Sequence, residues 1–235
     1  MGHFQPLAAL GALRQERRYS IIANNMANSQ TVGFKKDVMV FRKVVDEATD
    51  RVKPQDMGRV ITSFQQGNLQ RTGNTLDLAI DGEGFFKVQT PNGIRYTRAG
   101  SFSLSPEKIL VNENGFPVMG RSGEITINGK DIVIDRDGSV TVNGGIVDQI
   151  SVVRLAEPNL LKKEGQTMMK LEGPPREMAA DPSQVVQGAL ESSNANVIEE
   201  MMRMLDAQRT YETCVRLIQS NDEMNSKIVN EVGKI

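Results

Sequence analysis

Carboxylates and glycines stand at several places in the chain at spacings that could serve chemistry. Asp135, Asp137 and Gly138 resemble the opening of a calcium-binding loop, which takes oxygen ligands from alternate positions and an acidic residue at its twelfth position. The twelfth position counted from Asp135 is Ile146, which has no oxygen to offer. We therefore interpret this string as a hairpin turn.

Two further strings hold partial motifs. Gly82–Gly84 begins like a dinucleotide-binding fingerprint, but Lys87 stands where the third glycine belongs, and a strand pattern follows instead of a helix. Asp77 and Asp81 could act as paired carboxylates in glycoside or proton chemistry. The residues between them are apolar and match a strand, and the chain has no tryptophan to form a sugar platform. Neither string predicts a catalytic site.

The chain has one histidine, His3, and one cysteine, Cys214. This excludes a disulfide framework within the chain and argues against a Cys/His zinc site or a histidine-based catalytic triad. His3 lies close to the N-terminus, and Cys214 lies on a helical pattern as a small apolar residue. We predict no catalytic residue, no cofactor-binding residue and no metal ligand, and hence a protein that is not an enzyme.

The charge balance and the apolar runs limit the partners. The chain has 28 Lys and Arg against 29 Asp and Glu, so its net charge is −1 and no basic patch for nucleic acid is expected. Its apolar runs are far shorter than the ~20 residues that cross a bilayer, and its N-terminus lacks the layout of a signal peptide. We expect no nucleic-acid partner, no membrane insertion and, for export, a route without a cleaved signal peptide.

Both ends of the chain predict long helices. Between Pro6 and Asn28, apolar and amide side chains recur at spacings of three and four. Between Asn196 and Val232 there is no proline or glycine, and Asn196 followed by Glu199 is typical of a helix N-cap.

The C-terminal helix also shows the alternating spacing of a coiled-coil seam. The seam residues are Val197, Met201, Met204, Gln208, Tyr211, Val215, Ile218, Asp222, Asn225 and Val229. Cys214 and Leu217 lie on an adjoining face, so the apolar surface is wider than one partner helix would cover. This predicts a coiled-coil-like helix with more than one neighbour.

The middle of the chain, from Gly67 to Gly173, has an all-β pattern. Short β-branched and aromatic runs are separated by dipeptides such as Asn92-Gly93 and Asn143-Gly144, which supply the positive φ angles of hairpin turns. The expected fold class is α+β, with a discontinuous N- and C-terminal coiled-coil-like helical domain and a central all-β domain. The expected parts are the N-terminal helix in residues 1–35, an extended connector in 36–66, the β-domain in 67–180 and the C-terminal helix in 181–235.

Neither terminal helix is expected to fold by itself. Ordering a helical backbone costs conformational entropy, which apolar side chains offset only when they are buried. Two helices lying against each other leave much of their apolar faces in water, so neighbouring copies of the chain would supply the missing contacts. The alternative is that both helices pack on the β-domain of the same chain.

The string Ala23–Asn28 holds three asparagines in five residues, although asparagine is a poor helix former. Asn24 and Asn28 share a helix face, where their amides could donate and accept hydrogen bonds across a contact. The alternative is a frayed helix end with Gly33 in a turn.

Three groups of segments resemble the bacterial flagellar rod and hook family, in the expected order and over nearly the whole chain. They are Ala23–Asn28 with Thr31–Lys35 at the N-terminus, Gly73–Phe86 with Tyr96–Phe102 in the β-region, and Gln187–Asn196 with Ala207–Glu212 at the C-terminus. The family usually has leucine where Met26 stands.

The resemblance implies a structural subunit of the flagellar basal-body rod. Such a subunit is exported unfolded by the flagellar export apparatus and assembles with copies of itself and other rod and hook axial proteins. The product is a helical tube that spans the periplasm and transmits torque from motor to hook.

The resemblance also favours one type of subunit within the family. The short connector after Lys43 and the compact β-region look most like the proximal rod subunit. The alternatives are a distal rod subunit, which has a longer insert after its N-terminal helix, and a hook subunit, which has additional outer domains. A third alternative is a secreted β-rich adhesin with a helical oligomerisation stalk.

The expected assembly interface combines apolar and amide residues near both ends of the chain. Its residues are Leu10, Leu13, Ile21, Asn24, Asn25, Asn28, Gly33, Phe34, Val197, Met201, Met204, Leu205, Gln208, Tyr211, Val215 and Ile218.

Overall fold

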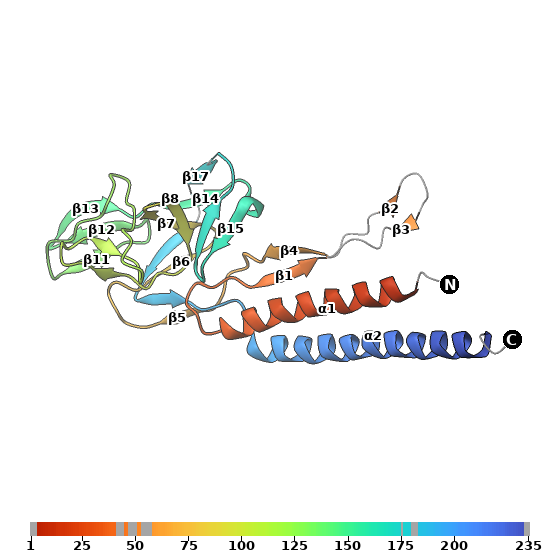
Figure 1. Cartoon of the computed structure of the whole chain (residues 1–235). Coiled ribbons are helices and arrows are strands. Elements are labelled where there is room, and N and C mark those ends of the chain that lie inside the picture. The colour runs from red at the N-terminus through yellow and green to blue at the C-terminus, as the bar shows by residue number, and fades with distance from the viewer. Residues whose placement is uncertain are drawn as a thin grey trace. The chain divides into compact units, whose positions relative to one another are not determined.

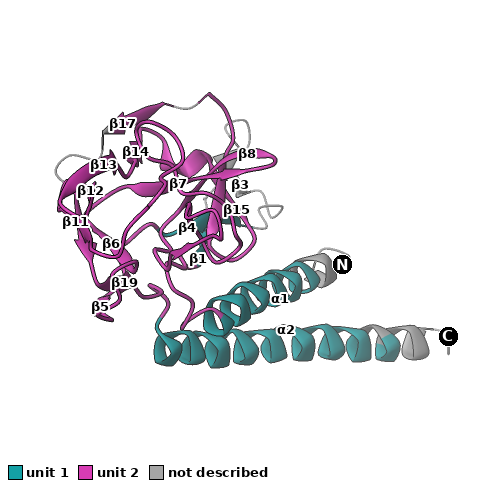
Figure 2. Cartoon of the chain, turned by 90° about the vertical axis from the view of Figure 1, so that its left-hand side faces the viewer, with its two compact units in different colours: residues 1–27, 37–63, 196–235 teal, residues 28–36, 64–195 magenta. Residues whose placement is uncertain are grey.

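The computed structural model describes residues 4–40, 45–46, 51–52, 58–174, 176–179 and 183–232. The chain forms two compact units, each built from segments that are far apart in the sequence (Figure 2). The first unit comprises Met1–Ala27, Asp37–Ser63 and Asn196–Ile235, and the second comprises Asn28–Lys36 and Phe64–Ala195.

Two long helices, α1 (Phe4–Ala27) and α2 (Val197–Val232), lie side by side and antiparallel in the first unit (Figure 1). The predicted N-cap of α2 is confirmed, because Asn196 Oδ1 accepts hydrogen bonds from the backbone N–H groups of Ile198 (2.9 Å) and Glu199 (3.3 Å).

The prediction of a coiled-coil-like domain made of the two terminal helices is wrong. The first unit also contains strands, all from the stretch predicted as an extended connector. β1 (Asp37–Val40) pairs with β4 (Arg59–Thr62), and β2 (Val45–Asp46) pairs with β3 (Arg51–Val52), both antiparallel. Because α1 contacts β1 as well as α2, this unit is a mixed layer of helices and strands.

The side of α2 that packs on α1 also differs from the predicted seam. Ala207 is buried, whereas Met201 and Tyr211 of the predicted seam are exposed. The helices approach each other through small residues, since a Cβ atom added to Gly11 would lie 3.1 Å from Cys214 Sγ. In a coiled coil, large seam side chains interlock between the helices. Here the helices approach closely at small residues, and the seam side chains Met201 and Tyr211 remain exposed.

The second unit is built from antiparallel β-sheets. The largest has six strands in the order β15-β16-β8-β7-β14-β17, another has the order β11-β12-β13, and the pairs are β10-β9, β18-β6 and β19-β5. The strands are β5 (Leu69–Arg71), β6 (Leu78–Asp81), β7 (Phe85–Thr90), β8 (Gly93–Thr97), β9 (Ser103–Leu104), β10 (Leu110–Val111), β11 (Ile132–Ile134), β12 (Ser139–Val142), β13 (Gly145–Gln149), β14 (Val152–Leu155), β15 (Leu161–Glu164), β16 (Met168–Leu171), β17 (Glu177–Ala179), β18 (Gln184–Gln187) and β19 (Ala189–Glu191), with one 3-10 turn, η1 (Pro158–Leu160).

The six-stranded sheet has an apolar cluster on each face. Phe86 belongs to a cluster with Phe102 and Leu110, whereas its neighbour Phe85 belongs to a second cluster with Leu155. Adjacent residues of a strand point to opposite faces, so β7 separates the two clusters.

One hairpin turn has the positive φ angles expected from its dipeptide. Asn143-Gly144 connects β12 and β13, with φ of +51° at Asn143 and +82° at Gly144. A two-residue hairpin whose residues both have positive φ matches the twist of the strands it joins.

Candidate assembly surface

Asn25 links three elements of the first unit. Its buried amide accepts a hydrogen bond from the Asp37 backbone N–H (2.9 Å) and donates one to the Asp37 carbonyl (2.8 Å), as a neighbouring strand would. The same amide lies 3.4 Å from Glu200 Oε2. This one side chain therefore fixes the end of α1 to both β1 and α2.

Glu200 places a carboxylate inside the same unit. Its side chain has no exposed surface, and its Oε1 lies 3.3 Å from Nη1 of Arg203, whose Nη2 lies 2.6 Å from Glu199. On the neighbouring strands, the Thr62 hydroxyl donates a hydrogen bond to the Asp37 carboxylate (2.8 Å). Because these polar groups satisfy one another, their contacts hold the unit together.

The beginning of α2 exposes a group of apolar side chains, which we name the α2 face. It consists of Val197, Ile198, Met201, Met202 and Leu205. Ile198 is 71% and Met202 68% exposed, and the spacing of the five residues places them on one side of the helix. An exposed apolar patch of this kind is a candidate surface for contact with another chain.

Two hollows lie beside the helices of the first unit. One, of about 500 Å³, is lined by residues of both helices that include Tyr19 and Tyr211. The other, of about 390 Å³, is lined by residues that include Ile22, Asn25 and Met39.

The structure separates the sixteen predicted interface residues by exposure. The exposed ones are Leu13, Asn24, Val197, Met201, Leu205, Gln208 and Tyr211. The partly buried ones are Leu10, Ile21, Met204, Val215 and Ile218. The buried ones are Asn25, Asn28, Gly33 and Phe34, whose surroundings lie within their own unit.

The segment Asn28–Lys36 belongs to the second unit and fits tightly there. Gly33 has φ of +68°, and an added Cβ atom would lie 2.2 Å from the backbone nitrogen of Ala99. The Gly33 N–H donates to the Glu191 carbonyl (2.7 Å), and the Phe34 ring lies 4.1 Å from the ammonium of Lys163. Only glycine combines this backbone conformation with this close approach.

A buried ion cluster, which the sequence analysis missed, joins three distant segments of the second unit. Glu191 lies 2.6 Å from Lys35 Nζ and 3.1 Å from Arg98 Nη1, and it also accepts a hydrogen bond from the Gly67 N–H (2.8 Å). Lys35 and Arg98 donate further hydrogen bonds to backbone carbonyl oxygens. No local signal in the sequence indicated this cluster, because its three charged residues are far apart along the chain.

Burial sets the electrostatics of this cluster. Desolvation lowers the pKa of the Lys35 ammonium below its usual value, and the Glu191 carboxylate acts in the opposite direction. Because the Glu191 carboxylate pairs with both Lys35 and Arg98, the stability of the cluster depends strongly on Glu191.

The residues considered for chemistry have local structural contacts. The Asp77 carboxylate accepts hydrogen bonds from Thr72 (2.6 Å) and Asn74 (3.2 Å). Asp137 accepts hydrogen bonds from the backbone N–H and the hydroxyl of Ser139, in the turn between β11 and β12. Cys214 is partly buried against Gly11, and His3 lies outside the described residues.

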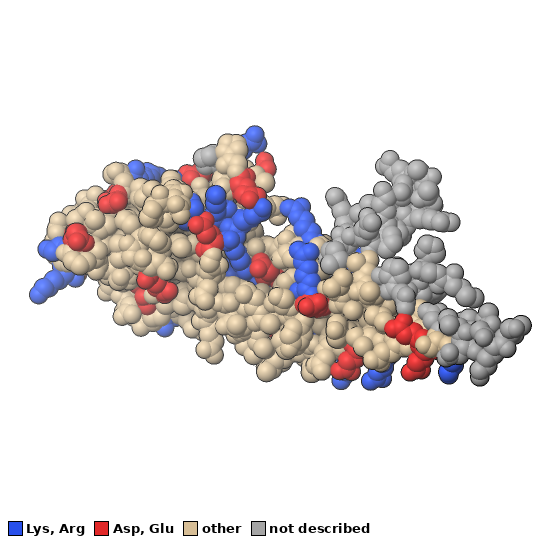
Figure 3. Space-filling model, viewed as in Figure 1, with Lys and Arg blue, Asp and Glu red and all other residues tan. Residues whose placement is uncertain are grey.

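The described part of the chain also bears on metal sites and on membrane-spanning helices. There, no group of three or more His, Cys, Asp and Glu side chains could hold a metal ion. No helix in those same residues combines the length and the apolar character that crossing a membrane requires. On the face shown in Figure 3, basic and acidic side chains are interspersed.

The first unit combines an exposed apolar helix face with buried polar side chains, Asn25 and Glu200, that bond within the unit. Residues 79–142 match the family described as the flagellar hook protein FlgE/F/G D1 domain, and residues 186–231 match the flagellar basal body rod FlgEFG protein C-terminal family. The chain belongs to the family of flagellar basal-body rod proteins.

Individual relatives support this membership. Flagellar basal-body rod protein FlgF of Caulobacter vibrioides is 34% identical, with 93% of each chain covered. FlgF of Rhizobium meliloti is 33% identical, with 93% of this chain and 92% of the relative covered. Flagellar basal-body rod protein FlgG of Bacillus subtilis is 30% identical, with 92% of this chain and 93% of the relative covered.

Proposed function

We propose that copies of this chain assemble through the α2 face and the neighbouring exposed residues of α1 into the proximal part of the flagellar rod. The chain is a structural subunit of the basal-body rod and acts with other rod and hook axial proteins. In the assembled helical tube, the packed helices carry torque from motor to hook.

The observation that carries this proposal is the solvent exposure of the α2 face. Five apolar side chains in nine residues of a helix remain in contact with water in the single chain. Burying these side chains against a neighbouring copy would lower the free energy of the assembled state, and this provides the driving force for assembly.

Alignment lengths favour the proximal over the distal type of subunit. The alignments with the two FlgF relatives run over 229 and 230 residues, and those with FlgG relatives run over 250 to 257, although they cover similar shares of this chain. The FlgG relatives therefore contain residues that have no counterpart here. Such extra residues fit the longer insert that the family resemblance attributes to the distal subunit.

Export and location follow from the same proposal. The subunit passes through the flagellar export apparatus without a cleaved signal peptide and reaches a rod that spans the periplasm. Its role in the rod is structural, and the proposal assigns it no catalytic function.

The substitution Leu205→Asp tests the proposal. It places a carboxylate on the α2 face, so incorporation of the chain into basal bodies and motility should be lost, whereas the second unit should remain folded. Ser220→Asp, at an exposed polar position further along α2, is the matched control and should assemble normally. The measurements are immunoblots of purified basal bodies, swarming assays and circular dichroism; normal rods from the Leu205→Asp strain would contradict the proposal.

A further inference from the structure

Two segments of the second unit continue directly into the long helices, and these segments are joined to each other. Asn28–Lys36 follows α1, and Glu191–Ala195 precedes Asn196, the cap of α2. Three hydrogen bonds connect the two segments: from the Gly33 N–H to the Glu191 carbonyl (2.7 Å), from the Lys36 N–H to Asn194 Oδ1 (2.7 Å) and from the Asn194 N–H to the Phe34 carbonyl (3.4 Å). We name this contact the junction.

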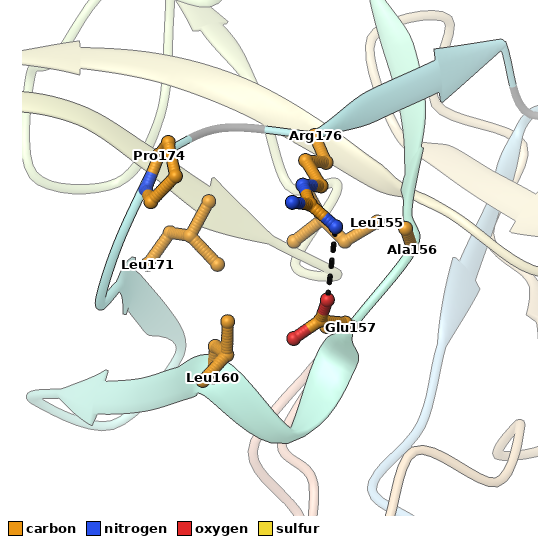
Figure 4. A pocket seen from close by; sticks show the side chains of 7 residues that line it. All are labelled: Leu155, Ala156, Glu157, Leu160, Leu171, Pro174 and Arg176. Carbon is orange, nitrogen blue, oxygen red and sulfur yellow. Dashed lines mark hydrogen bonds and ion pairs between the residues drawn. The ribbon is translucent and has the colours of Figure 1, made fainter.

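A buried ion pair strengthens the junction. Lys35 Nζ lies 2.6 Å from the Glu191 carboxylate, and the two side chains are 1% and 0% exposed. The Arg176–Glu157 pair, beside the small pocket of the same unit shown in Figure 4, is by contrast exposed, with its charged atoms 3.4 Å apart. Exposed pairs contribute little to stability, whereas opening a buried pair leaves uncompensated charges. The junction therefore stays closed while the second unit is folded.

The junction shortens the path along the chain between the two helices. Asn25 Nδ2 of α1 lies 3.4 Å from Glu200 Oε2 of α2, although the two residues are 175 positions apart in sequence. A path from Asn25 to Lys36, across the junction, and from Asn194 to Glu200 has only about 17 residues. Bringing two parts of a chain together costs less entropy when the path between them is shorter.

We infer that the junction makes α1 pair with the α2 of its own chain in the free subunit. The effective concentration of two linked groups falls with about the −3/2 power of the length between them. Shortening the path from 175 to about 17 residues therefore raises the effective concentration of α1 at α2 roughly thirtyfold. The inference concerns the free subunit and does not depend on the proposed rod.

Pairing within one chain has a consequence for assembly. Long helices at both ends of identical chains can be exchanged between copies, which produces swapped dimers. The junction favours the helix of the same chain over the helix of another copy. It determines which helices meet, whereas ordering those helices still requires buried contacts.

A disulfide between α1 and α2 measures the effective concentration. A Cβ atom at position 11 would lie 3.1 Å from Cys214 Sγ, so the thiol introduced by Gly11→Cys can bond to Cys214. Thiol–disulfide exchange with glutathione in the dilute monomer gives the equilibrium constant of this bond. Its ratio to the constant for a free thiol is the effective concentration.

The substitution Phe34→Asp, added to Gly11→Cys, tests the inference. The Phe34 side chain is 2% exposed and belongs to neither apolar cluster of the second unit, so a carboxylate there should release Asn28–Lys36 and leave both clusters in place. The next fixed point is Gly67, whose N–H donates to the Glu191 carboxylate (2.8 Å). The path then has about 51 residues, and the effective concentration should fall roughly fivefold.

The matched control is Gln30→Asp, at an exposed position of the same segment, which should leave the effective concentration unchanged. Circular dichroism during urea unfolding shows whether the second unit of each variant is folded. If Phe34→Asp unfolds it, the effective concentration should fall further, roughly thirtyfold below that of the parent. An unchanged value for Phe34→Asp, with the second unit folded or unfolded, would overturn the inference.

Discussion

Glu191 supplies the carboxylate of the buried ion cluster in the second unit. It is the common partner of Lys35 and Arg98, and all three side chains are nearly or fully buried. Two buried cations without a carboxylate would be far more costly than the same cations in water. Phe34 and Lys35 of the family segment Thr31–Lys35 are both buried in the second unit.

The substitution Glu191→Gln keeps the size of the side chain and removes its charge. The free energy of unfolding of the second unit should fall by ~3–5 kcal/mol, since Lys35 and Arg98 lose their counter-charge. Urea unfolding of the purified chain measures this loss.

The control is Glu172→Gln, which breaks the exposed pair with Lys162 and should cost at most ~1 kcal/mol. Equal losses for the two variants would refute the assigned importance of the cluster.

At the scale of elements, segments that enter and leave the second unit are joined to each other. Asn28–Lys36 is the first segment of the second unit, and β19 lies near the end of that unit. A backbone hydrogen bond from the Gly33 N–H to the Glu191 carbonyl joins this segment to β19. Asn194 adds a second link, because its Oδ1 accepts a hydrogen bond from the Lys36 N–H (2.7 Å). The two passages of the chain therefore depend on each other.

Gly33→Ala should disrupt this junction. The new Cβ atom would meet the backbone of Ala99 at 2.2 Å while φ stays at +68°, so strain adds to a clash. Unfolding in urea should reveal a loss larger than the ~1–3 kcal/mol expected for strain alone.

Gly115→Ala is the matched control for this prediction. Gly115 has φ of +79° with nothing within 4 Å of an added Cβ atom, so this variant introduces strain without a clash. A Gly33→Ala variant as stable as Gly115→Ala would show that the close contact with Ala99 is unimportant.

At the scale of the whole molecule, the two units differ in how much apolar surface they bury. The second unit contains both apolar clusters. In the first unit, Ile22 and Ala207 are the only buried apolar side chains among the residues whose burial is described. The first unit therefore has little apolar burial to offset the cost of ordering its helices.

Amide hydrogen exchange of the dilute monomer should reflect this difference. We expect rapid exchange throughout Pro6–Asn28 and Asn196–Val232 and slow exchange in the central β-region, since helices with few buried contacts open readily. Incorporation into rods should slow exchange in both helices. Slow exchange of both helices in the dilute monomer would contradict the view that neighbouring copies complete them.

Local features of this protein could be predicted from its sequence. Three such features are the periodic apolar residues of both termini, the Asn196 cap and the Asn143-Gly144 turn. Each depends only on residues that are close together in the sequence. The membership of the flagellar rod family could likewise be predicted from the order of the matching segments in the sequence.

The tertiary structure alone decided which surfaces are covered. Helical periodicity placed Met201 and Ala207 on α2, but the close approach of Gly11 and Cys214 determined that Ala207 is buried and Met201 exposed. Lys35 and Glu191 meet across a sequence separation of 156 residues. Periodicity fixes where side chains lie on one element, whereas burial and ion pairing depend on which elements pack together, and that is settled by the free energy of the whole fold.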